Sequence, residues 1–167
     1  MDHAVFMTEA LKLAQGALER GEFPVGCVMV YQGDIIANGV RRHTRGKAKN
    51  EIDHAEMVAL RRLSELPGEI DSGQVIVYCT MEPCLMCFSA ILLSGIRTIV
   101  YAYEDAMGGG TGIDLSALSP LYRDMKIQII PHILREESLK LFQAYFSHPG
   151  NTYWKGSFLE QYTINQQ

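Results

Sequence analysis

The sequence has few cysteines and no long apolar run. Four cysteines in 167 residues are too few and too unevenly spaced for the disulfide scaffold of a small secreted domain. The longest apolar stretches, such as 75–78 and 90–93, are far shorter than the roughly 20 residues that a membrane-spanning helix requires. These absences argue against a disulfide-rich scaffold and lead us to expect no membrane-spanning segment.

The first residues also lead us to expect no secretory leader. The first residues, Met1-Asp2-His3-Ala4, contain no basic cluster followed by an apolar run, which is the pattern of a signal peptide. We therefore expect a cytoplasmic protein, whose cysteines stay reduced. On this expectation the cysteines are thiols or metal ligands.

Composition is typical of a globular protein. Hydrophobic residues make up 47% of the chain and charged residues 20%, with a formal net charge of −4, outside the ranges of disordered or collagen-like sequences. The length suits one domain. We expect a single domain over residues 1–167, of which 150–167 form a C-terminal tail rich in aromatic residues.

Apolar periodicity predicts alternating helices and strands. Helical spacing extends over 2–20, 54–63, 82–94 and 135–146, and strand character over 23–31, 35–40, 74–80, 98–103 and 126–132. The first two strands form a predicted hairpin around Gln32-Gly33-Asp34. After the hairpin the strands and helices alternate, which favours a mostly parallel sheet covered by helices.

Two predicted helix starts carry metal-ligand side chains. His54 lies at one, and Cys84 and Cys87 lie three positions apart at the next. Cysteines in the first turn of a helix direct their sulfurs to one point, where unpaired N–H groups favour the thiolate. Two thiolates and an imidazole suit zinc, and three protein ligands leave a fourth position for water. We expect one Zn²⁺ per chain.

Glu56 follows His54 by two positions, on the same helical turn. Its carboxylate could reach water at the metal without being a ligand. Zinc lowers the pKa of water to about 7, and hydrolysis at a ring carbon that bears an amino group then needs several proton transfers. We expect Glu56 to be the catalytic residue of a hydrolase that releases ammonia.

These residues resemble the cytidine/deoxycytidylate deaminase superfamily, whose signature is H-x-E followed by P-C-x-x-C. The matching segments are His54-Ala55-Glu56 and Pro83-Cys84-Leu85-Met86-Cys87. Further segments, Phe23-Pro24-Val25-Gly26 and 105–112, resemble the bacterial tRNA adenosine deaminase branch. The resemblance covers about 5–146 and implies a three-layer α/β/α sandwich with a mixed, mostly parallel five-stranded sheet, and a homodimer. It also implies zinc ligands at His54, Cys84 and Cys87, with Glu56 as the proton shuttle.

The resemblance implies adenosine in tRNA as the substrate. Our candidate substrate contacts are Arg41, Ala55, Pro83, Asp105 and Trp154. Arg41 stands where the branch carries an Asn that hydrogen-bonds the nucleoside, and a guanidinium cannot act as an acceptor. Because of this departure, a free base, nucleoside or nucleotide of the guanine, cytosine or adenine type stays open as the alternative substrate.

Other interpretations compete with this one. A Cys-x-x-Cys pair could be a redox motif, which would leave His54 and Glu56 unexplained. A closed structural zinc site would need a fourth ligand, and the nearby candidate, Cys79, is expected to be a core thiol, as is Cys27. A non-catalytic zinc or RNA-binding subunit is the remote alternative, because such subunits lack the shuttle carboxylate.

Three further segments allow two interpretations each. The stretch 41–49 carries five positive charges and no negative one, as a solvated loop or a phosphate contact would. The run 108–112 is rich in glycine but lacks a following Gly-Lys-Ser/Thr, so we expect a flexible loop rather than a phosphate cradle. The aromatic tail packs on its own body or on a partner subunit, or one of its rings caps the pocket and stacks on a base.

Overall fold

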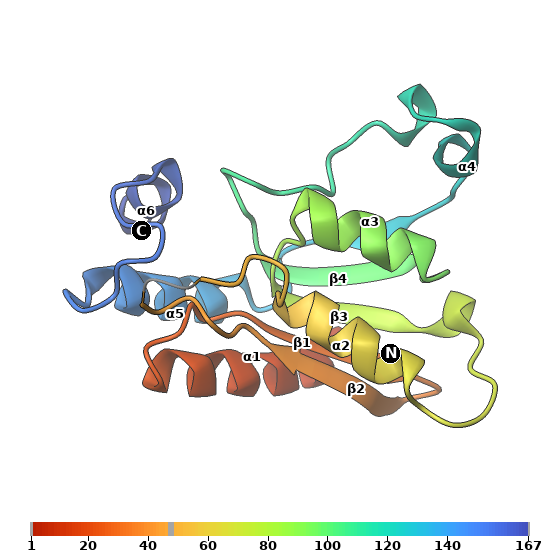
Figure 1. Ribbon diagram of the computed structural model, residues 1–167, viewed down its shortest axis with the longest axis horizontal. Helices are drawn as coiled ribbons and strands as arrows, with labels where there is room; N and C mark the ends of the chain where they lie inside the picture. The colour runs from red at the N-terminus through yellow and green to blue at the C-terminus, as the bar shows by residue number, and fades with distance from the viewer. Residues whose placement is uncertain (1, 47–48, 167) are drawn as a thin grey trace.

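The computed structural model describes residues 2–46 and 49–166, which fold around one five-stranded sheet with helices on both faces (Figure 1). The strands are β1 (Gly26–Tyr31), β2 (Asp34–Val40), β3 (Ile76–Met81), β4 (Thr98–Tyr103) and β5 (Gln128–Ile130). The α-helices are α1 (His3–Glu19), α2 (Ala55–Ser64), α3 (Leu85–Leu93), α4 (Pro120–Arg123), α5 (Arg135–Ser147) and α6 (Phe158–Ile164). Short 3₁₀ turns lie at Ser72–Gln74 and Leu115–Ala117. None of the helices in these residues has both the length and the apolar character needed to span a bilayer.

The strands lie in the order β2, β1, β3, β4, β5. β1 is antiparallel to β2 and to β3, whereas β3, β4 and β5 are parallel to one another. The sheet is mixed, as expected. The prediction of a mostly parallel sheet fits the strand directions, because β1 alone is reversed. It is less accurate for the pairings, because two of the four pairings are antiparallel. The reason is that the hairpin inserts β1 between β2 and β3, which makes both pairings of β1 antiparallel.

Helices α1 and α5 cover one face of the sheet, and α2 and α3 cover the other (Figure 1). Side chains alternate along β1: Cys27 and Met29 pack toward α2 and α3, whereas Val28 and Val30 pack with Met7 of α1. The four β1 side chains are at most 2% exposed, so β1 contributes to an apolar core on both faces. The expected α/β/α sandwich is confirmed.

Several elements differ from the prediction. β1 begins at Gly26 rather than at residue 23. α3 begins at Leu85 rather than at residue 82, because Glu82 precedes Pro83 and a residue before proline disfavours the helical conformation, and because Cys84 itself is extended (φ −66°, ψ 170°). β5 is limited to Gln128–Ile130, within the predicted 126–132. The tail contains α6, a helix of 7 residues, which is too short to produce a clear periodic pattern.

Helix α2 lies unusually close to β2 at Gly39. A Cβ atom added at Gly39 would lie 1.9 Å from the carbonyl oxygen of Ala55 and 2.8 Å from the backbone nitrogen of Ala59. Only glycine permits this approach of strand to helix. The contact places the first turn of α2, which carries Glu56, directly against the sheet.

Candidate active site

The metal-ligand candidates stand at the starts of two helices. His54 is the N-cap of α2 and Cys84 is the N-cap of α3, both with extended backbone (ψ 157° and 170°). Cys87 lies three positions further on, in the first turn of α3. Because α2 and α3 pack against each other on the same face of the sheet, the two helix starts bring these three side chains together.

The three side chains form a compact donor group. Nδ1 of His54 lies 3.5 Å from Sγ of Cys84 and 3.5 Å from Sγ of Cys87, and the ligand atoms all lie within 4.8 Å of one another. These separations suit one ion with metal–ligand bonds of about 2.0–2.3 Å. Two sulfurs and an imidazole nitrogen are donors that zinc prefers. The residues present therefore fit one zinc ion, bound through Nδ1 and the two sulfurs.

The surroundings of Cys84 favour its thiolate form. The neighbouring Cys87 thiol lowers the pKa of Cys84 to about 4, with a further contribution from His54 and against the opposing effect of burial. The contact with Cys84, followed by burial, raises the pKa of Cys87. Cys84 is therefore ionised at neutral pH and able to bind a cation.

The remaining two cysteines lie outside the donor group. Sγ of Cys79 contacts Sγ of Cys27 at 3.8 Å, across the pairing of β3 with β1, and both side chains are fully buried. Burial raises the pKa of Cys79 well above its ordinary value, as expected for a core thiol. Within the described part of the chain the donor group has three members, which is the ligand number of catalytic rather than structural zinc sites.

Glu56 lies beside the donor group without belonging to it. Its side chain is in the first turn of α2 and is 3% exposed, and its Oε2 atom lies 3.5 Å from Sγ of Cys87. Burial raises the pKa of the Glu56 carboxyl group, and this shift toward neutrality suits a group that both accepts and releases protons.

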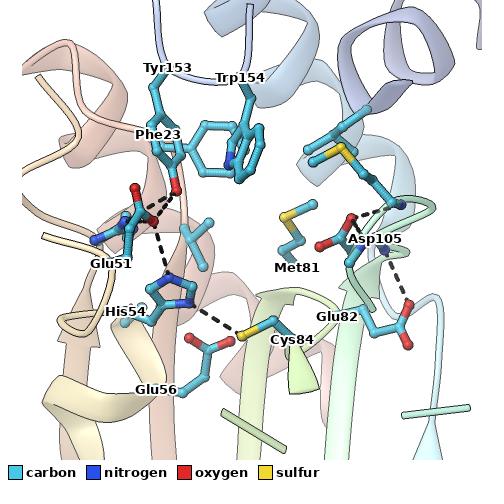
Figure 2. Close-up of a pocket in the computed structure, with 16 residues that line it drawn as sticks. Phe23, Glu51, His54, Glu56, Met81, Glu82, Cys84, Asp105, Tyr153 and Trp154 are labelled. Carbon is cyan, nitrogen blue, oxygen red and sulfur yellow. Dashed lines mark hydrogen bonds and ion pairs between the residues drawn. The ribbon is translucent and has the colours of Figure 1, made fainter. Parts of the chain in front are cut away.

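A cavity of about 300 Å³ opens next to these residues (Figure 2). Of the candidate substrate contacts, Arg41, Ala55, Asp105 and Trp154 line the cavity. Pro83 is not among the lining residues, and its carbonyl oxygen accepts the N–H of Gly110 at 2.9 Å. Other lining residues are His54, Glu56 and Cys84 at the metal group, and the apolar Phe23, Val25, Met81, Met107 and Leu159.

Asp105 extends into the cavity from the loop after β4 (Figure 2). Its Oδ1 atom accepts the N–H groups of Met107 at 3.0 Å and Gly108 at 2.8 Å, and burial raises the pKa of its carboxyl group. The Glu82 carboxylate accepts the N–H groups of Asp105 and Thr111, each at 3.2 Å. These bonds hold the loop as one wall of the cavity.

Close packing explains two glycines of this loop. A Cβ atom added at Gly109 would lie 2.4 Å from Oε2 of Glu82, and one added at Gly110 would lie 2.6 Å from Cα of Leu85. The glycines therefore let the loop pack against the start of α3, a contact that composition alone does not reveal.

Arg41 is directed into the protein. Its side chain is 2% exposed, and Nη1 donates to the carbonyl oxygens of Arg42, Asn50 and Asp53 at 2.8, 2.6 and 3.2 Å. Nη2 donates to Oε2 of Glu51 at 3.1 Å. Arg41 therefore lines the cavity but uses its donors to hold the loop before α2. Most of its partners are backbone carbonyls, so no sequence motif indicates this role.

Within the basic stretch, Arg42, His43, Arg45 and Lys49 are exposed, and Thr44 is buried like Arg41. Positions 47 and 48 lie outside the described residues. The phosphate-contact interpretation of this stretch stays a prediction.

Sequence reasoning missed Glu51 as a cavity residue. It precedes His54 by three positions, and its Oε2 atom lies 3.9 Å from Nε2 of His54. The hydroxyl of Tyr153 in the tail donates to the same oxygen at 2.7 Å. The three-residue spacing from His54 was the available signal, although an acidic residue just before a helix has many possible causes.

The aromatic tail packs on the body of its own chain and also reaches the cavity. The hydroxyl of Tyr103 in β4 lies 3.0 Å from Oγ1 of Thr163, and Tyr153, Trp154 and Leu159 line the cavity. Figure 2 shows Trp154 across the cavity from Glu56. Both the packing interpretation and the capping interpretation of the tail therefore have support within this one chain.

Comparison with known proteins gives a consistent result. Residues 1–103 match the family model of the cytidine and deoxycytidylate deaminase zinc-binding region. The chain is 35% identical over 149 residues to tRNA-specific adenosine deaminase 2 of Danio rerio, covering 84% of this chain and 69% of that protein. It is 32% identical to the tRNA-specific adenosine deaminase of Bacillus subtilis (strain 168), covering 85% of this chain and 87% of that protein.

Solved structures share the fold. One from a study of A-to-I editing at the wobble position of transfer RNA has a TM-score of 0.66 and 30% identity, and the match covers 81% of this chain and 97% of that one. A guanine deaminase from Nitrosomonas europaea, at 22% identity, matches 86% of this chain and 84% of its own. The second similarity shows the fold alone.

A buried carboxylate beside three side chains that fit a zinc ion, on a cavity of an α/β/α sandwich, is the arrangement of a zinc-dependent hydrolase. The family match spans both helix starts that supply this arrangement. The chain belongs to the family of cytidine and deoxycytidylate deaminases, and it is accordingly a hydrolytic deaminase with one zinc ion per chain.

Proposed function

We propose that this deaminase converts adenosine in tRNA to inosine. The observation that carries the chemistry is the position of Glu56, a buried carboxylate 3.5 Å from a donor sulfur, on a cavity of about 300 Å³ that is of the size used for small ligands. The choice of substrate is supported by the relatives of 30% identity and more, which are tRNA-specific adenosine deaminases.

In the proposed reaction, water replaces the amino group on a ring carbon and ammonia leaves. Zinc held by His54, Cys84 and Cys87 would lower the pKa of water to about 7 and so supply a nucleophile at neutral pH. Glu56 would take up the proton from water on its carboxylate and deliver protons to the ring nitrogen and to the leaving amino group. The raised pKa of Glu56 favours both halves of this transfer.

The cavity walls would orient the base. Phe23 and Trp154 offer aromatic surfaces across from Glu56 (Figure 2), against which a base can stack. Asp105 offers a carboxylate that can accept an N–H of the base. A nucleotide in folded RNA must be splayed out to enter, at a cost of a few kcal/mol.

The test is inosine formation by the purified zinc enzyme. A tRNA with adenosine at the wobble position is compared with the same tRNA carrying guanosine there, and with adenine, guanine, cytosine and their nucleosides and nucleotides. We expect inosine and ammonia from the adenosine tRNA, at a rate that falls steeply with salt. Turnover confined to a free base, nucleoside or nucleotide would overturn the tRNA substrate, and no turnover at all would overturn the reaction.

We further propose that the chain acts as a single domain and as a homodimer in the cytoplasm. Leu85 and Leu93 of α3 and Leu121 of α4 are 53%, 59% and 61% exposed, and a second copy would remove such side chains from water. The four cysteines are free, which suits a reducing compartment. A monomer in sedimentation at micromolar concentration would contradict the dimer.

A further inference from the structure

Glu51 lies between the metal-ligand candidate His54 and the aromatic tail (Figure 2). Its Oε2 atom accepts Nη2 of Arg41 at 3.1 Å and the hydroxyl of Tyr153 at 2.7 Å. The same oxygen lies 3.9 Å from Nε2 of His54. One carboxylate oxygen therefore connects a metal ligand, a buried cation and the tail.

We propose that Glu51 is a positioning residue for the zinc ligand His54, and that Tyr153 of the tail holds Glu51 in place. The proposal rests on the zinc site of the proposed function and extends that site to two residues that do not bind the metal.

The first argument concerns the two ring nitrogens of His54. Nδ1 faces the sulfurs of Cys84 and Cys87 at 3.5 Å, and it must carry no proton if it is to bind a metal, so the proton belongs on Nε2. A carboxylate on the Nε2 side stabilises that tautomer and that ring orientation. At 3.9 Å the attraction is electrostatic rather than a hydrogen bond.

The second argument concerns the charge of Arg41. Its guanidinium is permanently ionised, is 2% exposed, and lines the same cavity as His54. An uncompensated positive charge there would oppose the binding of a divalent cation. Glu51 accepts a hydrogen bond from this guanidinium and also lies close to His54. Its negative charge therefore offsets the repulsion between Arg41 and a divalent cation.

The third argument concerns the tail. The side chain of Glu51 is 53% exposed, so packing alone does not set its conformation. The hydrogen-bond donors Arg41 and Tyr153 hold its carboxylate oxygen in place. Tyr153 is 5% exposed and packs edge-on against Phe23, with ring centroids 5.3 Å apart. Burial, together with the bond to Glu51, raises the pKa of Tyr153, so its hydroxyl stays a donor.

The test measures zinc affinity by competition with a chelator, starting from the zinc-loaded enzyme. Glu51→Ala is expected to lower the affinity about 10- to 100-fold. Glu51→Gln keeps an acceptor oxygen without the charge, and its affinity should fall between those of the wild type and Glu51→Ala. Tyr153→Phe, which removes only the hydroxyl, should lower the affinity in the same direction but by less.

Tyr162→Phe is the matched control. It removes another tail hydroxyl that donates to a carboxylate, that of Glu104 at 2.8 Å, but neither residue lines the cavity. We expect its zinc affinity to be unchanged. Thermal unfolding of each variant, with and without added zinc, verifies that the variant folds.

The double variant decides the coupling. If Tyr153 acts through Glu51, then E51A/Y153F should bind zinc no more weakly than E51A. Unchanged affinity in E51A overturns the role of Glu51. Additive losses in the double variant, or an equal loss in Tyr162→Phe, overturn the role of the tail. None of these measurements uses tRNA, so they distinguish a failure of this proposal from a failure of the proposed substrate.

Discussion

The Oε2 atom of Glu56 lies 3.5 Å from the Sγ atom of Cys87, although the two residues belong to different helices and are 31 positions apart. This contact places the proposed proton shuttle against a proposed metal ligand without making it one of the donors. In the proposed function, metal binding and proton transfer are therefore assigned to different side chains, and substitution can separate them.

Replacement of Glu56 by alanine should leave the zinc content unchanged and lower the rate of ammonia release about 10²- to 10⁴-fold, because general acid and base catalysis is lost while all three donors remain. Elemental analysis and an ammonia assay measure the two effects. Glu69→Ala, at an exposed position after α2, is the control and should retain full activity. Equal turnover in the Glu56 variant would refute the shuttle role.

Replacement of Trp154 by alanine should raise KM about tenfold with little effect on kcat, because stacking of a base on an aromatic ring contributes about 1–3 kcal/mol. Phe158→Ala is the control, since Phe158 is an exposed aromatic residue of the same tail (58%, against 43% for Trp154) that does not line the cavity. Steady-state kinetics on the proposed tRNA substrate measures both. The stacking role fails if the two variants have the same KM.

Replacement of Gly39 by alanine should destabilise the fold by about 3 kcal/mol or more, because the new Cβ would lie 1.9 Å from a backbone oxygen of α2 and neither backbone can move freely. Gly112→Ala is the matched control, since a Cβ there meets nothing within 4 Å. Denaturant unfolding measures both free energies. Equal stability of the two variants would show that the helix can retreat from β2 at little cost.

Glu104 should make the docking of the tail sensitive to acid. Its carboxylate accepts Nε of Arg135 and the hydroxyl of Tyr162, each at 2.8 Å. Burial by itself would raise the pKa of Glu104, but the bonds from Arg135 and Tyr162 outweigh it and hold the pKa below the ordinary value of 4.5. The stabilisation is therefore complete above that value and is lost as the pH falls through the lower pKa of the folded state.

Thermal unfolding between neutral pH and about pH 3 checks this expectation. Glu104→Gln should cost about 2 kcal/mol at neutral pH and should weaken the acid dependence. Glu137→Gln, at an exposed position of α5, serves as the control. It should change neither the stability at neutral pH nor the acid dependence. An acid dependence that is the same in wild type and Glu104→Gln would assign the effect to other groups.

The prediction of the zinc ligands from the sequence relied on local spacing. Cys84 and Cys87 share one helical turn, and His54 and Glu56 share another, so the two halves of the donor group are each determined by residues within a few positions. The helices and strands that carry them were predicted on the same basis, with bounds that differ from the structure by a few residues at most positions.

Long-range pairing lies outside that kind of reasoning. The hairpin was predicted, but the position of β1 between β2 and β3 depends on which edge of the hairpin β3 joins. Arg41 was expected to face the substrate, and its partners turned out to be carbonyls of its own loop together with Glu51 and the hydroxyl of Tyr153. The bond from Tyr153 to Glu51 joins residues 102 positions apart.

The identity of the candidate metal ligands and the local geometry of each helix start thus follow from the order of residues. The reason is that ligand type, helix starts and the period of apolar residues are properties of neighbouring positions. The shape of the cavity and the closure of its wall by the tail follow from folding, since they depend on which distant segments the sheet and its helices bring into contact.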